Sequence, residues 1–155
     1  MKRIEELVRE VSDFEGLSDG HLDLIAGCGS NVNFDDGAYI FREGDDADAF
    51  YALRAGDVAL ETAAPARTPL VIETLHAGDV LGWSWLFEPH RVRYDARAIG
   101  TVRAISFDGG CLRGKCEADH ELGYELMRRF ARIMVERLQA TRMRLLDVYG
   151  APARI

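Results

Sequence analysis

The segment from Asn31 to Phe107 alternates short apolar runs with turn residues, and this pattern restricts the fold more than any other feature of the chain. Glycine beside an acidic residue marks most of the turns, as in Asp36-Gly37 and Gly78-Asp79. Many short strands separated in this way are typical of an antiparallel sandwich or barrel. The apolar runs predict eight strands, over residues 32–34, 39–41, 50–53, 58–62, 70–75, 80–81, 96–99 and 102–107.

Helices are expected on both sides of this segment. Residues 2–11 carry apolar side chains at helical spacing, and Ser18 is a good N-cap for a second short helix that ends near Gly27 or Gly29. Residues 111–116 predict a short helix. Asp119 is a suitable N-cap for a long final helix that runs to about Tyr149.

The long helix carries two apolar stripes. One follows spacings of four and three, as in a coiled-coil seam, and consists of Met127, Ala131, Met134, Leu138, Thr141, Leu145 and Val148. The other consists of Leu126, Phe130, Ile133 and Met143, and we expect it to pack on the strands. A helix of about 30 residues is ~45 Å long, which exceeds what a small domain needs as cover. The seam therefore predicts a parallel homodimer; the alternative is a wide apolar face folded back on its own domain.

Composition excludes several function classes. The net charge of −7 argues against a nucleic-acid binder driven by overall charge. The six arginines of the last helix, between Arg128 and Arg144, are interpreted as a solvated face. No apolar run approaches the ~20 residues that span a bilayer, and the charged N-terminus lacks a signal peptide, so a cytoplasmic location without membrane attachment is expected.

Cysteine and histidine spacing gives no sign of catalysis or metal binding. The three cysteines, Cys28, Cys111 and Cys116, form no CxxC pair, and the four histidines are scattered. We therefore expect free structural cysteines and no metal site. No nucleophile and base are paired in the sequence, so an enzyme is not expected.

The stretch from Gly78 to Ala96, GDVLGWSWLFEPHRVRYDA, is the candidate functional segment. Gly82 opens an apolar turn that holds both tryptophans, Trp83 and Trp85, and Pro89 ends it. Free N–H groups at the start of a helical turn favour an anion, and arginine binds phosphate in a planar fork. Arg91 and Arg93 follow at a spacing of two and could complete such a cradle. The alternative is a hydrophobic turn beside two solvated arginines.

Several motifs together resemble the cyclic-nucleotide-binding domain of catabolite-activator-type (Crp/Fnr-like) bacterial regulators, protein kinase A regulatory subunits and gated channels. They are GAYIFREGD (37–45), FYALRAGDV (50–58), GDVLG (78–82), ARA (96–98) and RLQAT (137–141). The resemblance covers Leu17 to Tyr149. It implies an α+β fold: an antiparallel eight-strand jelly-roll β-barrel flanked by N-terminal helices and a long C-terminal dimerisation helix.

The resemblance also implies a domain layout. The parts are N-terminal helices (1–30), the β-barrel (31–107), and a short helix plus the long helix (108–150), all in one domain. The helix-turn-helix that follows this domain in the bacterial regulators is not expected here, so no direct contact with nucleic acid is predicted.

The binding motif departs from the family pattern. The glutamate that would follow Gly82 and bind the ribose hydroxyl is replaced by Trp83. The interval from Gly82 to Ala96 is shorter than in the typical cassette, so Arg91 and Arg93 compete for the phosphate, while counting back from Ala96 gives His90. Thr141 falls where the family's long helix offers a hydroxyl to the base.

The resemblance implies a non-enzymatic sensor for a small anionic ligand, namely cAMP, cGMP or an altered ligand, bound between the cassette and the long helix. It would signal through the homodimer to a separate effector protein. The expected ligand-binding residues are Gly82, Trp83, Ser84, Trp85, Arg91, Arg93, Tyr94, Thr141 and Arg142. No cofactor beyond that ligand is expected. The alternative is a degenerate domain that acts only as a dimerisation or interaction scaffold, with Trp83 and Trp85 as core residues.

Overall fold

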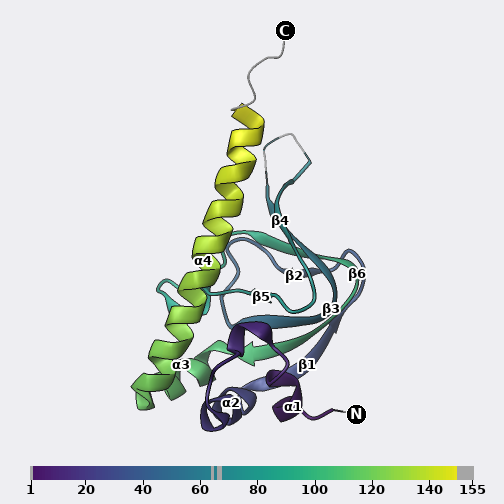
Figure 1. The fold of residues 1–155 in the computed structure, drawn as a ribbon. Coiled ribbons are helices and arrows are strands. Elements are labelled where there is room, and N and C mark those ends of the chain that lie inside the picture. Colours follow the sequence, from purple (N-terminus) through teal and green to yellow (C-terminus); the bar gives the residue numbers. More distant parts are fainter. Residues whose placement is uncertain (1, 64, 66–67, 150–155) are drawn as a thin grey trace.

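The computed structural model describes residues 2–63, 65 and 68–149, which form an antiparallel sheet flanked by helices (Figure 1). Short helices α1 (Ile4–Val8), η1 (Ser12–Phe14) and α2 (Asp19–Ala26) precede the sheet. The strands are β1 (Gly29–Phe34), β2 (Tyr39–Phe41), β3 (Ala49–Thr62), β4 (Leu70–Leu75), β5 (Val80–Leu81) and β6 (Asp95–Asp108), with the turn η2 (Ser84–Leu86) before β6. Helices α3 (Gly109–Ala118) and α4 (His120–Tyr149) follow.

Side-chain caps fix where the helices begin. The Ser18 hydroxyl accepts a hydrogen bond from the His21 N–H at 3.1 Å, and Asp119 Oδ1 accepts one from the Leu122 N–H at 3.1 Å. Both N-caps were predicted, because serine and aspartate satisfy the free N–H groups of the first turn. Helix α3 begins earlier than predicted, since Asp108 caps it by accepting from the Cys111 N–H at 2.7 Å.

Within the described residues the sheet has six strands in the order β1-β6-β3-β4, with β2 also paired to β6 and β5 to β3, and it is not closed. The prediction of eight strands is therefore wrong. Four of the expected runs merge in pairs into the long strands β3 and β6. Gly56, with φ +83°, lies at a bulge inside β3 rather than in a turn. A Cβ there would lie 2.3 Å from the Thr101 carbonyl oxygen, so the two strands approach too closely for any other residue.

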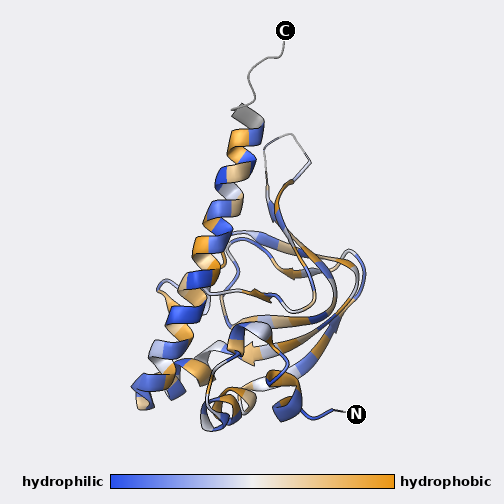
Figure 2. Cartoon of the chain, viewed as in Figure 1, coloured by the Kyte–Doolittle hydropathy of each residue, from blue (hydrophilic) through white to orange (hydrophobic). Residues whose placement is uncertain are grey.

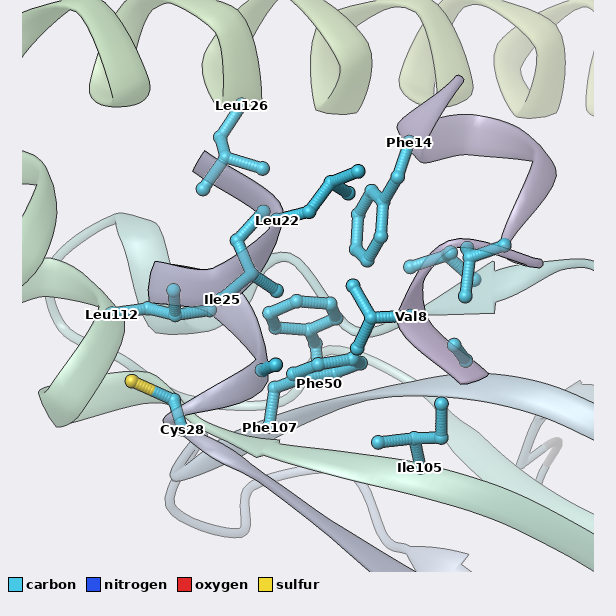
Figure 3. Close-up of a cluster of buried hydrophobic side chains, with 14 of the residues drawn as sticks. Val8, Phe14, Leu22, Ile25, Cys28, Phe50, Ile105, Phe107, Leu112 and Leu126 are labelled. Carbon is cyan, nitrogen blue, oxygen red and sulfur yellow. The ribbon is translucent and has the colours of Figure 1, made fainter. Parts of the chain in front are cut away.

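A dense aromatic core joins the N-terminal helices, the strands and α4 (Figure 3). Phe50 stands at its centre and stacks on Phe107 and Trp85, with ring centroids 4.5 and 5.3 Å apart. Phe130 of α4 meets the same ring edge-on at 5.2 Å. Aromatic rings bury large apolar areas, so this cluster fixes the first half of α4 against the sheet.

A disulfide crosses the chain between Cys28 and Cys111, with Cα atoms 5.8 Å apart. The prediction that these cysteines are free is therefore wrong, while Cys116 is a free thiol. The bond joins the end of the N-terminal helical segment to the first turn of α3. A hydrogen bond joins the same two segments, since the Lys115 ammonium of α3 donates to the Leu24 carbonyl of α2 at 2.6 Å.

Helix α4 runs past the sheet, and its second half lies beside β4 (Figure 1). Leu126, Phe130 and Ile133 are buried as predicted, but Met143 is 60 % exposed and does not join them. Apolar residues alternate with polar ones along the coloured part of the helix (Figure 2).

The predicted seam lies mainly on the open side of α4. Met127, Ala131, Leu138 and Leu145 are exposed, Met134 and Thr141 are half-buried, and the side chain of Val148 lies outside the described residues. None of the described helices is both long and apolar enough to cross a membrane.

Candidate functional site

A cavity of about 260 Å³ lies between the sheet and the middle of α4. Strands β3 and β4, the residue before η2 and the segment before β6 form one wall, and α4 forms the other. Most of the lining is apolar, with one cation and one carboxylate. The lining residues are Leu60, Ile72, Glu73, Trp83, Tyr94, Met134, Arg137, Leu138 and Thr141.

Arg137 of α4 is the centre of this site, because its guanidinium is the only cationic group among the described lining residues. The residue is 9 % exposed. Its Nη2 donates to the carbonyl of Val80, and its Nη1 lies 3.5 Å from the Tyr94 hydroxyl. The guanidinium carbon stands 4.7 Å above the centre of the Trp83 ring, in a cation–π arrangement. One side chain thus joins α4 to three parts of the sheet wall.

Glu73 of β4 balances part of this charge. Its Oε2 lies 3.5 Å from Arg137 Nε, yet this buried oxygen accepts no hydrogen bond from the described residues. Burial raises the pKa of Glu73, and the nearby Arg137 opposes that rise. The pair is therefore an ion pair with an unsatisfied acceptor, which leaves the Nε–H of Arg137 open to a better partner.

Further carboxylates lie near Arg137 in a second, smaller space. Asp13, Asp79 and Glu136 line a smaller space of about 60 Å³ together with Glu73 and Arg137. Burial, followed by repulsion from Asp79 and Glu136, raises the pKa of Asp13. The guanidinium therefore lies within a mainly acidic surrounding.

Trp83 and Tyr94 form the aromatic wall. Gly82 turns the chain with φ +90°, and a Cβ there would meet the Ala49 carbonyl oxygen at 3.3 Å, so the turn brings Trp83 close to the sheet. The two rings meet edge to face with centroids 6.0 Å apart. Burial raises the pKa of Tyr94, opposed by Arg137, so this hydroxyl is a neutral donor at neutral pH.

Aromatic contacts continue from Tyr94 into the space between the strands. Tyr94 contacts Phe41 at 5.6 Å between centroids, Phe41 contacts Tyr51 at 6.4 Å, and Tyr51 contacts Phe34 at 5.9 Å. Val92 is buried in the same cluster. This space is therefore filled by side chains, and the open volume of the site is on the α4 side.

The sequence placed Trp83, Tyr94 and Thr141 in the site, and the structure brings all three to the cavity. The Thr141 hydroxyl donates to the Arg137 carbonyl at 2.9 Å, which leaves its oxygen free to accept. Gly82 serves by positioning Trp83. Ser84 and Arg142 do not line the cavity.

Trp85 does not belong to the site. It is fully buried in the aromatic core against Phe50, so the interpretation of this tryptophan as a core residue is correct and its assignment to the ligand site is wrong.

The two cassette arginines also lie outside the cavity lining. Side chains alternate along this extended segment, so the buried Val92 points inward and its neighbours point to solvent. Arg91 Nη1 lies 2.6 Å from Asp46 Oδ1, and Arg93 is exposed. In this structure neither arginine faces a ligand in the cavity.

Arg137 is the site residue that the sequence analysis missed, because it was grouped with the solvated arginines of α4. Its position in the helix could have predicted this role. Arg137 follows Phe130 by seven positions and Ile133 by four, so it lies on the same face of the helix as the stripe that packs on the sheet.

The chain thus combines an antiparallel sheet, short N-terminal helices and a long helix that closes a cavity beside a glycine-opened turn. A family model described as the cyclic nucleotide-binding domain matches residues 31–119. The chain belongs to this family. The matched stretch includes Trp83 and Tyr94, whereas Arg137 and Thr141 lie on α4 beyond it.

The relatives of this chain include regulatory proteins. The CRP-like cAMP-activated global transcriptional regulator of Mycobacterium tuberculosis is 26 % identical over 154 residues, which cover 98 % of this chain and 67 % of that protein. A solved putative cyclic nucleotide-binding protein from Geobacter metallireducens is 30 % identical with a TM-score of 0.78, covering 89 % of this chain and 99 % of that one. The regulatory domain of Toxoplasma gondii PKA, solved with cAMP, shares the fold at 19 % identity and a TM-score of 0.69, covering 83 % of this chain and 49 % of that chain.

Proposed function

We propose that this protein is a non-enzymatic sensor that binds a small anionic ligand, cAMP, cGMP or an altered ligand, in the cavity between Trp83, Tyr94 and α4. The observation that carries the proposal is the buried Arg137 guanidinium, which faces an apolar cavity with a hydrogen-bond donor unfilled. An anionic group there would gain charge-assisted hydrogen bonds in a shielded position.

The same helix would transmit the signal. Arg137 and Thr141 line the cavity, while Leu138, between them, lines it and also lies on the exposed seam. A ligand that prefers one position of α4 would therefore change the surface offered to a second copy or to a separate effector protein. We propose a parallel homodimer along this seam.

A scaffold without a ligand is the second candidate. It is favoured by the filled space between the strands and by the outward position of both cassette arginines. Under this function Arg137 only fastens α4 to the sheet.

Thermal unfolding with and without millimolar cAMP and cGMP tests the proposal. A ligand at 100 times its Kd should add about 2.7 kcal/mol, which raises the midpoint of a chain of this size by roughly 8 °C. Arg137→Gln should abolish the rise, whereas the matched surface variant Arg91→Ala/Arg93→Ala should retain it. If neither nucleotide moves the midpoint, both are excluded as ligands at such levels.

Light scattering on the same samples tests the dimer. The unchanged chain should have the mass of two copies, and Leu145→Glu should reduce it to one, because a charge is placed in the seam. Gln139→Glu, an exposed position on the same helix, is the matched control and should leave the mass unchanged.

A further inference from the structure

The cavity differs in its chemistry from a site for a sugar phosphate. Six of its lining residues are apolar or aromatic: Leu60, Ile72, Trp83, Tyr94, Met134 and Leu138. The polar groups of the lining side chains are those of Arg137, Glu73 and Thr141, the Tyr94 hydroxyl and the Trp83 indole N–H. The ribose of a cyclic nucleotide would bring its 2′-hydroxyl group against mainly apolar walls, and a buried hydroxyl without a partner costs free energy.

On the strand side, the region beyond the cavity is filled by side chains. The aromatic contacts from Tyr94 through Phe41 and Tyr51 fill the region between the strands. Trp83 occupies the turn after Gly82, and one face of its indole is covered by the Arg137 guanidinium. The region between the strands is therefore closed to a ligand, whereas a further space of about 660 Å³, which shares Ile72 and Thr141 with the cavity, lies beside the second half of α4.

Arg137 limits the charge of the ligand. Arginine has five N–H donors, and here one donates to Val80 and another lies at 3.5 Å from Tyr94. Donors thus remain for one planar acidic group, which a carboxylate fits in a bidentate manner. Four carboxylates, those of Asp13, Glu73, Asp79 and Glu136, line the space that also contains this guanidinium, so a ligand with several negative charges would be repelled there.

We infer that the ligand of this cavity is an aromatic carboxylate without a sugar, with its flat apolar ring against Trp83 and Tyr94 and its carboxylate on Arg137, rather than a cyclic nucleotide. This inference rests on the proposed function and names the ligand class of that same site. Glu73 and the ligand carboxylate compete for Arg137, so binding displaces Glu73 from the guanidinium. The raised pKa of Glu73 agrees with this, because the carboxyl group takes up a proton readily once its partner is lost.

Isothermal titration with two probes of one shape tests the inference. The first is 2-naphthoate, and the second is the neutral 2-naphthamide, which keeps the ring but lacks the charge. The unchanged protein should bind 2-naphthoate at least tenfold more tightly than the amide. Arg137→Gln should remove that preference while leaving the weak amide binding in place, and Arg91→Ala/Arg93→Ala should change neither.

Glu73→Gln separates ligand recognition from a purely structural ion pair. It removes the competing carboxylate with little change in shape, so the affinity for 2-naphthoate should rise severalfold even if the variant is less stable. A fall in affinity would overturn the displacement of Glu73. This variant also keeps the test decisive if Arg137→Gln does not fold.

The outcomes distinguish the two proposals. Equal binding of both probes, or no loss in Arg137→Gln, overturns the inferred carboxylate site. Binding of cAMP or cGMP that Arg137→Gln abolishes, without binding of 2-naphthoate, overturns the ligand class but supports the sensor. If none of the four compounds binds at millimolar concentration, the inference fails and the scaffold replaces the sensor.

Discussion

Removal of the Cys28–Cys111 disulfide should cost this protein a large part of its stability. The change we choose is the double variant Cys28→Ala/Cys111→Ala, which keeps small apolar side chains at two packed positions. Cys28 is only 8 % exposed, and alanine introduces no polar atom at this buried position. The expected loss of stability then comes mainly from the conformational entropy that the unfolded chain regains without the bond.

The magnitude follows from the size of the loop that the bond closes. The two cysteines are 83 positions apart. The chain-entropy relation gives about 4.5 kcal/mol for a loop of this length at 25 °C. A chain of 155 residues has an unfolding entropy of roughly 0.33 kcal/mol per degree. The unfolding midpoint should therefore fall by about 14 °C.

Calorimetry on the double variant and the unchanged protein measures this shift. Cys116→Ala is the matched control, because it removes a half-buried thiol but keeps the bond, and it should cost about 1 kcal/mol or less. Alkylation of the unfolded, unreduced protein should modify one cysteine. Modification of all three, or a midpoint change below about 3 °C in the double variant, would refute the reasoning.

Two further predictions concern packing and charge. Gly109→Ala should lower the free energy of unfolding in urea by about 1–3 kcal/mol, because the new Cβ would lie 2.8 Å from the Trp85 Cβ. Gly114→Ala in α3 should raise it by about 1 kcal/mol, because no atom apart from its chain neighbours and the nearby helix backbone lies within 4 Å of the new Cβ, and alanine favours the helix. The opposite result for either glycine would contradict the packing described. Burial raises the pKa of Asp13 in the folded state, so stability is lost as the pH rises from the unfolded value through the folded one. Asp13→Asn should therefore gain stability relative to the unchanged protein as the pH rises above the ordinary aspartate pKa of about 4, and a difference independent of pH would refute the burial of this carboxyl group.

The sequence predicted those features that depend on neighbouring residues. The caps at Ser18 and Asp119 and the buried stripe of Leu126, Phe130 and Ile133 were correct, because each is decided within one or two turns of helix. The placement of Trp83, Tyr94 and Thr141 beside one cavity came from the family resemblance.

Features that depend on distant contacts could not be predicted. Gly56 has the sequence signature of a turn, and only the close approach of Thr101 shows that it lies at a bulge inside a continuous strand. Cys28 and Cys111 are brought together by the pairing of the strands between them, which spacing alone does not reveal. The sequence also could not show which face of the segment around Val92 points inward. The structure buries Val92 and leaves both neighbouring arginines, the phosphate-binding candidates, exposed.

Because α4 is long, a small movement of the helix beside the cavity becomes a larger displacement at its C-terminal end. The helix has 30 residues and is held by Phe130 and Ile133 in its first half. From Ile133 to its end at Tyr149 it extends about 24 Å at a rise of ~1.5 Å per residue. A tilt of about 5° around that fixed point would carry the far end through roughly 2 Å, whereas Arg137, one turn from the pivot, would move about 0.5 Å. The protein therefore has the proportions of a lever with a short input arm and a long output arm.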